Sequence, residues 1–365
     1  MSASVGMRSL AISLPRTIRK NDFWRERYPK LVADEERKTL ARLWKANERA
    51  APVDPFEIAM APYLSDPFRG ARERRVLDPG QSAASLELDC ARRALDAAGL
   101  RADQVGLLVA SSFLPDQIGV GNATPLAKAL GHKGAAWNVE TTCSGALVAL
   151  QNACALIKGG EFETALVIVS CTYSRVADED DTLCWFLGDG AGAFVVGRTP
   201  PGASYLGAKT LNTGDTCNTF FYEVVADARG PRIRMDCTPE TGRVLAETSQ
   251  PYLRASCEGA AQAAGVKLSE IDFFVFNTPT AWYGEFCRRA LGVPEERSVD
   301  TYPEYANVGP ALLPVNLYRA AASGRLKPGD LVLLYTIGSV SSAGALVMRW
   351  GDVALGGLGE VGGKG

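Results

Sequence analysis

The 365-residue chain repeats one order of helices and strands, and this internal duplication constrains the fold more than any other feature. The segment Ala191–Gly197 (AGAFVVG) resembles Ala343–Arg349 (AGALVMR). Each follows a helix-like stretch, a glycine-containing turn and a long apolar strand. Strands that alternate with helices predict an α/β architecture. The sequence therefore predicts an α/β protein made of two related halves.

The repeat sets the predicted domain boundaries. The first half is expected to hold helices at 82–99, 122–131 and 144–159 and strands at 105–111, 135–140, 164–170 and 190–197. The second is expected to hold strands at 203–212, 271–277, 330–336 and 343–350 and helices at 247–265, 281–292 and 311–324. We assign 1–198 and 199–350 to the two halves and 351–365 to a flexible tail.

Residues 17–67 fit neither repeat and are rich in charged and aromatic side chains. We interpret them as a helical insertion, with one or two surface helices that cover the pocket or a partner surface. A solvated insertion without function is the alternative.

Composition excludes several classes of protein. The formal net charge of −2 gives no basic field for nucleic acid or anionic membrane. No run of 18 apolar residues is present, so no membrane span is expected, and the N-terminus lacks signal-peptide features. Nine cysteines, an odd number without a CxxC pair, favour free thiols in a reducing cytoplasm. With a single histidine, a metal site is improbable.

One cysteine stands apart from the others. Cys143, in Glu140–Ala146 (ETTCSGA), follows a strand-like run and precedes a helix rich in small residues. A thiol at a helix start meets unpaired N–H groups and the positive end of the helix dipole, which favour thiolate. The sequence therefore predicts a nucleophilic thiol for acyl transfer through a thioester.

The motifs together resemble the ketoacyl-synthase III family of the thiolase superfamily over about residues 70–350. They are Arg72–Arg75 (RERR), Ala91–Leu95 (ARRAL), Thr142–Ala146 (TCSGA), Phe186–Ala193 (FLGDGAGA) and Tyr305–Asn307 (YAN). The resemblance implies a thiolase-like fold with a duplicated five-layered α-β-α-β-α arrangement. It also implies a homodimer and a coenzyme A or phosphopantetheine thioester as substrate, with no resident cofactor.

The resemblance extends to site residues one by one. Cys143 matches the acyl-accepting cysteine and Asn307 the active-site asparagine. The strand that ends in histidine in the family reads DFFVFN here, so Asn277 takes the place of that histidine. The glycine-rich turn before the last strand is altered to GSVSSA, and we expect an oxyanion hole from the backbone N–H groups of Cys143 and Ser339, or of Val340.

The missing histidine leaves the proton chemistry open. Asn277 and Asn307 can donate hydrogen bonds to a thioester carbonyl, but an amide cannot act as a general base. Asp116 and Glu304 are candidate replacements for the base. The single histidine, His132, is expected in an exposed loop, and Asp189, in a glycine-rich turn, is expected to be structural and to bond backbone amides.

Two functions follow. The leading hypothesis is an acyltransferase or condensing enzyme that takes an acyl group from acyl-CoA or acyl carrier protein onto Cys143 and passes it to a second substrate. Polyketide or related specialised biosynthesis is the expected setting. The alternative is a non-catalytic or pocket-shaping partner subunit of a ketosynthase heterodimer.

Overall fold

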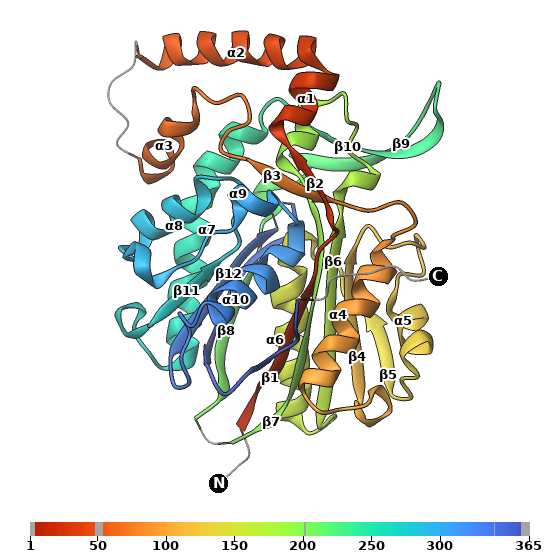
Figure 1. Ribbon diagram of the computed structural model, residues 1–365. Helices are drawn as coiled ribbons and strands as arrows, with labels where there is room; N and C mark the ends of the chain where they lie inside the picture. Colours follow the sequence, from red (N-terminus) through yellow and green to blue (C-terminus); the bar gives the residue numbers. More distant parts are fainter. Residues whose placement is uncertain (1–3, 48–53, 201, 339, 359–365) are drawn as a thin grey trace.

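Two mixed β-sheets lie face to face with helices between them and on both outer faces (Figure 1). The structure, a computed structural model, describes residues 4–47, 54–200, 202–338 and 340–358. The order of layers is helix, sheet, helix, sheet, helix. It confirms the predicted five-layered arrangement.

The first sheet has six strands, in the order β14-β1-β7-β6-β4-β5. Their bounds are Ala354–Leu355, Ser4–Ser13, Asp189–Thr199, Thr164–Thr172, Leu107–Phe113 and Ala135–Asn138. Strand β7 is antiparallel to β1 and β6, whereas β4 is parallel to β6 and β5. Strands β4 and β6 are almost continuously apolar and buried, as expected for a sheet covered on both faces.

The second sheet repeats this order with fewer strands: β8-β13-β12-β11. Their bounds are Ser204–Asn212, Ser342–Arg349, Leu331–Gly338 and Phe273–Phe276. Strand β13 is antiparallel to β8 and β12, and β11 is parallel to β12, which matches β1, β7, β6 and β4 of the first sheet. A single parallel bridge between Phe274 and Ser298 lies where the first sheet has β5.

Three helical layers bury these sheets. Helices α6 (Gly145–Gly159) and α10 (Leu312–Ala322) lie between the sheets in the largest apolar core. Helices α4 (Ala83–Ala97) and α5 (Ala123–Leu130) cover the first sheet, and α7 (Thr241–Ala264) and α8 (Tyr283–Leu291) cover the second. Helix α7 begins six residues before its predicted start.

The insertion at 17–67 holds a short strand and three helices. Strand β2 (Thr17–Lys20) pairs with β3 (Glu73–Val76), and α1 (Asn21–Arg27), α2 (Pro29–Asn47) and α3 (Pro55–Met60) follow β2. Figure 1 shows these helices at one end of the molecule. Short helix α9 (Tyr302–Tyr305) precedes the Asn307 turn.

A buried arginine anchors this insertion. Arg74 of the RERR motif is fully buried, and its guanidinium donates to the Trp185 carbonyl and, over 2.7 Å, to Asn21 Oδ1. It also lies 4.5 Å from the Trp24 ring centroid. Burial lowers the pKa of Arg74 to about 10. The motif therefore has a structural role here, joining α1 to the segment before β7.

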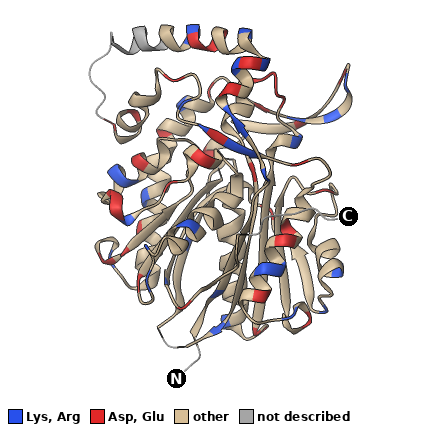
Figure 2. Cartoon of the chain, in the orientation of Figure 1, with Lys and Arg blue, Asp and Glu red and all other residues tan. Residues whose placement is uncertain are grey.

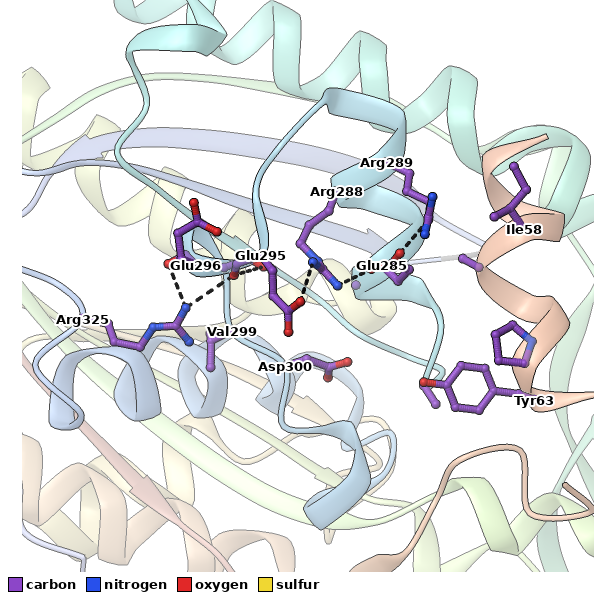
Figure 3. A pocket seen from close by; sticks show the side chains of 15 residues that line it. Ile58, Tyr63, Glu285, Arg288, Arg289, Glu295, Glu296, Val299, Asp300 and Arg325 are labelled. Atoms are coloured by element: carbon purple, nitrogen blue, oxygen red, sulfur yellow. Dashed lines mark hydrogen bonds and ion pairs between the residues drawn. The ribbon is translucent and has the colours of Figure 1, made fainter. Parts of the chain in front are cut away.

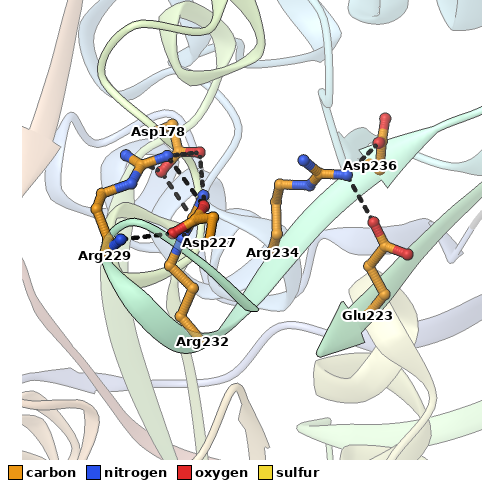
Figure 4. A network of polar contacts seen from close by, with 7 residues as sticks. All are labelled: Asp178, Glu223, Asp227, Arg229, Arg232, Arg234 and Asp236. Atoms are coloured by element: carbon orange, nitrogen blue, oxygen red, sulfur yellow. Dashed lines mark hydrogen bonds and ion pairs between the residues drawn. The ribbon is translucent and has the colours of Figure 1, made fainter. Parts of the chain in front are cut away.

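A β-hairpin that the sequence analysis missed lies at the same end. It consists of β9 (Phe220–Asp227) and β10 (Gly230–Cys237). Near its turn, Asp178 accepts from both terminal guanidinium nitrogens of Arg229 and of Arg232 over 2.9–3.0 Å, and Asp227 pairs with the same arginines (Figure 4). This network attaches the hairpin to the loop after β6.

The predicted flexible tail is partly ordered. Ala354–Leu355 forms β14, which pairs in parallel with β1, and the Gly356 N–H donates to the Leu10 carbonyl over 2.9 Å. The prediction is therefore wrong for this part of the tail, because the chain returns from the second half to extend the first sheet. Residues 359–365 lie outside the described part.

Charges of both signs are interspersed over the outer elements, and the central strands and α6 carry few of them (Figure 2). Among the helices that the structure describes, none combines the length and apolar character needed to cross a membrane.

Candidate active site

Cys143 lies in a strained turn between the first sheet and α6. The chain leaves β5 and makes a 3-10 turn over Thr142–Ser144 before α6 begins at Gly145. Thr142 has φ +53°, which is unfavourable for a β-branched residue. A side chain at Gly145 would overlap the Ser111 hydroxyl. The turn thus requires glycine and stores strain beside the thiol.

The Asn307 turn repeats this geometry in the second half. Ala306 has φ +54°, close to the value at Thr142, and a 3-10 turn leads into α10. The Asn307 N–H donates to the Phe186 carbonyl and its carbonyl accepts from the Gly188 N–H, both over 2.9 Å. Its Oδ1 accepts from the Gly309 N–H over 2.8 Å. The start of the FLGDGAGA motif therefore holds Asn307 in place.

Cys143 and Asn307 line one apolar cavity of about 590 Å³. Helix α3 contributes Phe56 and Met60, and the hairpin contributes Phe220, Met235 and Cys237. Further apolar lining comes from Leu183, Phe186, Leu187, Leu245, Trp282 and Ile337. Of the described residues that line the cavity, Arg69 alone is charged, and none has a carboxylate or an imidazole. An apolar acyl group suits such a cavity.

The thiol is not activated in the way that the sequence predicts. Cys143 is only 5% exposed, and burial raises the pKa of its thiol to about 11. A hydrogen bond with Tyr173 lowers this pKa, and the charge of the Glu140 carboxylate raises it further. The expectation of a lowered pKa is therefore wrong. Desolvation outweighs the favourable field of the helix start. The resting site holds a neutral thiol.

Asn277 lies behind the thiol instead of in the cavity. Its side chain is fully buried, and Nδ2 donates to the Cys143 and Gly309 carbonyls, each over 3.4 Å. These two acceptors fix the orientation of the amide, because the flipped form would place Oδ1 against both. Oδ1 has no partner among the described residues. The predicted polarisation of a thioester carbonyl does not fit this position, and Asn277 joins the Cys143 and Asn307 turns.

A tyrosine that the sequence analysis missed is beside the nucleophile. Tyr173 lines the cavity, and its hydroxyl is 3.6 Å from Cys143 Sγ. Tyr173 directly follows β6, which ends at Thr172. A polar residue just past a buried strand is a weak signal that could have identified it.

The two candidate bases lie elsewhere. Asp116 accepts from the Ala83 and Ala84 N–H groups at the start of α4 and forms an ion pair of 2.8 Å with Arg175. Glu304 pairs with Arg319 over 3.2 Å, and its side chain is 55% exposed. Neither lines the cavity, so a base at either position is not supported.

His132 and Asp189 both have structural surroundings. His132 is buried, contrary to the prediction of an exposed loop, and its two ring nitrogens contact the Ala102 and Ala135 carbonyls over 3.1 and 3.0 Å. Asp189 is fully buried and accepts from the Leu77 and Ser174 N–H groups. Burial raises the pKa of Asp189 to about 6.

The predicted oxyanion hole is only partly described. Ser339 lies outside the described residues. Its neighbour Gly338 packs so closely against Thr142 and the Thr141 carbonyl that a side chain there would clash. The Ser144 hydroxyl contacts that of Ser342 over 2.6 Å, which ties the nucleophile turn to β13.

A second cavity, of about 750 Å³, lies between α3 and α8 (Figure 3). Its charged side chains are largely paired with one another: Glu285 contacts Arg288 and Arg289, and Glu295 contacts Arg288. Cys143 does not line it. Within the described residues, no group of three His, Cys, Asp or Glu side chains is arranged to hold a metal ion.

The sequence of the chain matches known proteins over most of its length. The family model for 3-oxoacyl-[acyl-carrier-protein] synthase III matches residues 137–214, and the model for its C-terminal part matches 261–350. Beta-ketoacyl-[acyl-carrier-protein] synthase III of Rhizorhabdus wittichii is 34% identical over 311 residues, or 82% of this chain and 95% of that protein. The enzyme of the same name from Bordetella petrii is 34% identical over 77% of this chain and 85% of its own length.

Solved structures share the fold. The 3-oxoacyl-(acyl carrier protein) synthase III of Pseudomonas aeruginosa superposes with a TM-score of 0.76 at 21% identity, over 96% of this chain and 99% of that one. The Aquifex aeolicus synthase III superposes with a TM-score of 0.75 at 23% identity, over 95% of this chain and all of that one. The predicted thiolase-like fold is thereby confirmed.

Proposed function

Because this chain belongs to the 3-oxoacyl-[acyl-carrier-protein] synthase III family, we propose that it is a condensing enzyme that carries an acyl group as a thioester on Cys143. The observation that carries the proposal is the position of Cys143 in an apolar cavity of about 590 Å³ that it shares with Asn307. A thiol in such a site can hold an acyl chain in an environment from which water is excluded.

The acyl donor is acyl-CoA or an acyl carrier protein, and the related enzymes are named for the acyl carrier protein. The lining favours an apolar acyl group, aliphatic or aromatic. Specialised pathways such as polyketide biosynthesis use such acyl groups as starter units, and we propose that the protein acts in a pathway of this kind. We also propose that it acts in a reducing cytoplasm.

The second step is carbon–carbon bond formation with a malonyl-type thioester. Loss of CO₂ supplies the carbanion, so this step needs no base, in agreement with a cavity whose described lining has neither carboxylate nor imidazole. The carbanion attacks the acyl carbonyl and Cys143 leaves as thiolate. The Asn307 amide and the Cys143 backbone N–H are the donors that we assign to the developing oxyanions.

Intact-protein mass spectrometry tests the first step. Incubation with octanoyl-CoA should add one octanoyl group to the wild-type protein and none to Cys143→Ala. Addition of a malonyl-loaded acyl carrier protein should then remove the octanoyl group from Cys143 and yield a β-ketoacyl group on the carrier protein. A mass gain that survives Cys143→Ala would contradict the proposal.

Two observations favour the alternative of a pocket-shaping partner subunit. The amide in the family's histidine position bonds backbone carbonyls, and burial raises the pKa of Cys143 to about 11. Under this alternative, the wild-type protein would show no octanoyl adduct even with donor in large excess, but would change the chain-length preference of an active ketosynthase mixed with it.

We also propose a homodimer through the β5 edge of the first sheet. Beside this edge the loop after β4 exposes Ile118 and Val120, 73% and 59% accessible, and Asn138 of β5 donates to the Val120 carbonyl over 3.0 Å. An unpaired strand edge beside exposed apolar side chains is a common interface. Sedimentation should give the mass of two chains, and Ile118→Lys with Val120→Lys should give that of one.

A further inference from the structure

The Tyr173 hydroxyl is held against the nucleophile from several sides. Its oxygen is 3.6 Å from Cys143 Sγ, and its ring packs edge-on against Phe113 with centroids 5.6 Å apart. The next residue, Ser174, donates from its N–H to Asp189 Oδ1 over 2.9 Å and from its hydroxyl to Oδ2. Tyr173 is 2% exposed and lines the cavity.

A second tyrosine lies near the first. Tyr222 of the hairpin packs edge-on against the same Phe113 ring, with centroids 5.5 Å apart, and its hydroxyl donates to Met235 Sδ over 3.2 Å. Since the Tyr222 proton is directed at this thioether, Tyr222 does not donate to Tyr173. The Tyr173 proton can therefore turn toward Cys143 and the cavity.

Transfer of an acyl group from a thioester to a neutral thiol requires two proton transfers. The Sγ proton must leave Cys143 as the new C–S bond forms, and the departing thiolate needs a proton. The amides of Asn277 and Asn307 cannot accept one, and the Glu140 carboxylate accepts from the Thr142 N–H and does not line the cavity. Among the described residues, Tyr173 is the hydroxyl that contacts both Sγ and the cavity.

We propose that the Tyr173 hydroxyl transfers the proton from Cys143 to the departing thiol during acylation, a step that rests on the proposed function. As Sγ bonds to the acyl carbon, its proton passes to Tyr173 Oη. The proton already on Oη passes to the departing sulfur as the old C–S bond breaks. The acyl group thus moves from the sulfur of the donor to Cys143 Sγ, and one proton moves in the opposite direction. The tyrosine is again protonated at the end of the step.

The test measures acyl-enzyme formation by rapid-quench mass spectrometry with two octanoyl thioesters. One is the N-acetylcysteamine thioester, whose departing alkyl thiolate needs a proton. The other is the 4-nitrothiophenol thioester, whose departing aryl thiolate does not. Tyr173→Phe should slow acylation by the alkyl thioester about 10²-fold, as expected for loss of acid–base catalysis. It should slow acylation by the aryl thioester less, because that reaction needs Tyr173 only to take up the Sγ proton and not to protonate a leaving group. A purely structural defect would slow both reactions equally.

Tyr335→Phe is the matched control. It removes a buried phenol hydroxyl that contacts Tyr283 over 3.4 Å and does not line the cavity, so both thioesters should react as with the wild type. If Tyr173→Phe does not fold, solvent isotope effects on the wild-type protein test the proposal. A solvent isotope effect that is larger for acylation by the alkyl thioester than by the aryl thioester supports the proposal, and equal isotope effects overturn it.

The outcomes separate the two levels of inference. No acylation of the wild type by either thioester contradicts the proposed function. Acylation of the wild type that Tyr173→Phe slows equally for both thioesters, or not at all, overturns the role of Tyr173 and leaves the proposed function intact.

Discussion

At the scale of single residues, burial decides the state of the nucleophile. Cys143 has the helix start that favours a thiolate, yet desolvation raises the pKa of its thiol to about 11. The Cys143 thiol must therefore lose its proton during acylation itself, to the neighbouring Tyr173 hydroxyl and from there to the departing sulfur. The reactivity of this thiol depends on what surrounds it more than on its position in a helix.

The first prediction concerns alkylation of Cys143 by iodoacetamide. Because thiolate is the reactive form, the rate should rise about tenfold per pH unit from 7 to 10, with no plateau near the ordinary value of about 8.5. Glu140→Gln should speed alkylation, since the Glu140 charge raises this pKa. Peptide-resolved mass spectrometry measures the rate at Cys143. A plateau below pH 9 would show that the thiol is already activated.

The second prediction concerns Asn277. Replacement by alanine leaves the Cys143 and Gly309 carbonyls without this donor, which should lower the free energy of unfolding by about 1–2 kcal/mol. It should also change the alkylation rate of Cys143. Urea denaturation and the alkylation assay measure these effects.

Asn316→Ala is the control for Asn277. This amide is also fully buried, but it accepts from the Thr301 hydroxyl over 2.5 Å and donates to the Phe276 carbonyl over 2.8 Å instead of to the Cys143 and Gly309 carbonyls. Asn316→Ala should cost more stability and leave alkylation unchanged. Wild-type behaviour of Asn277→Ala in both assays would rule out its positioning role.

At the scale of elements, hairpin β9–β10 forms a two-stranded sheet of its own in the cavity wall and pairs with a strand of neither large sheet. It supplies Phe220 and Met235 to the cavity and places Tyr222 beside Tyr173. The Asp178 network holds the turn end of the hairpin, with Asp178 and Arg232 each about 20% exposed. Partly buried pairs of this kind are screened less by salt than exposed ones.

The third prediction follows from this attachment. Asp178→Asn should weaken the hairpin by about 1 kcal/mol and speed hydrogen exchange over 220–237 about fivefold, with little change in global stability. Glu223→Gln is the control, because Arg234 is more exposed and keeps Asp236 as a partner. Uniform acceleration across the whole chain would contradict a local role.

At the scale of the whole molecule, a buried carboxyl makes stability depend on pH. Burial raises the pKa of Asp189 to about 6 from an ordinary 3.8. Below pH 4 both the folded and the unfolded chain hold this proton, and the contribution to stability is complete. Between pH 4 and 6 the unfolded chain releases the proton first, so the contribution falls with rising pH and is lost above 6.

The fourth prediction is the size and sign of that change. The free energy of unfolding should lose on the order of 3 kcal/mol from this group between pH 4 and 7. The loss should be absent in Asp189→Asn, whose side chain does not titrate. Urea denaturation at several pH values compares the two proteins. An equal pH dependence in both would exclude Asp189 as the source.

Features that depend on short stretches of chain can be predicted from the amino-acid sequence. The repeat, the order of most strands and helices, and the turns at Cys143 and Asn307 follow from local hydrophobic patterns and turn chemistry. The two positive φ angles before these residues show why the turns need particular neighbours.

The side chains that surround the thiol come together through tertiary contacts. Tyr173 lies 30 residues from Cys143 in the chain and Asn277 lies 134 residues from it, whereas Asp116 and Glu304 are engaged elsewhere. Strand β14 likewise joins a sheet whose other strands come from the first half. Contact and desolvation depend on distant segments, which no local pattern encodes. The same desolvation reversed the predicted pKa shift of the nucleophile.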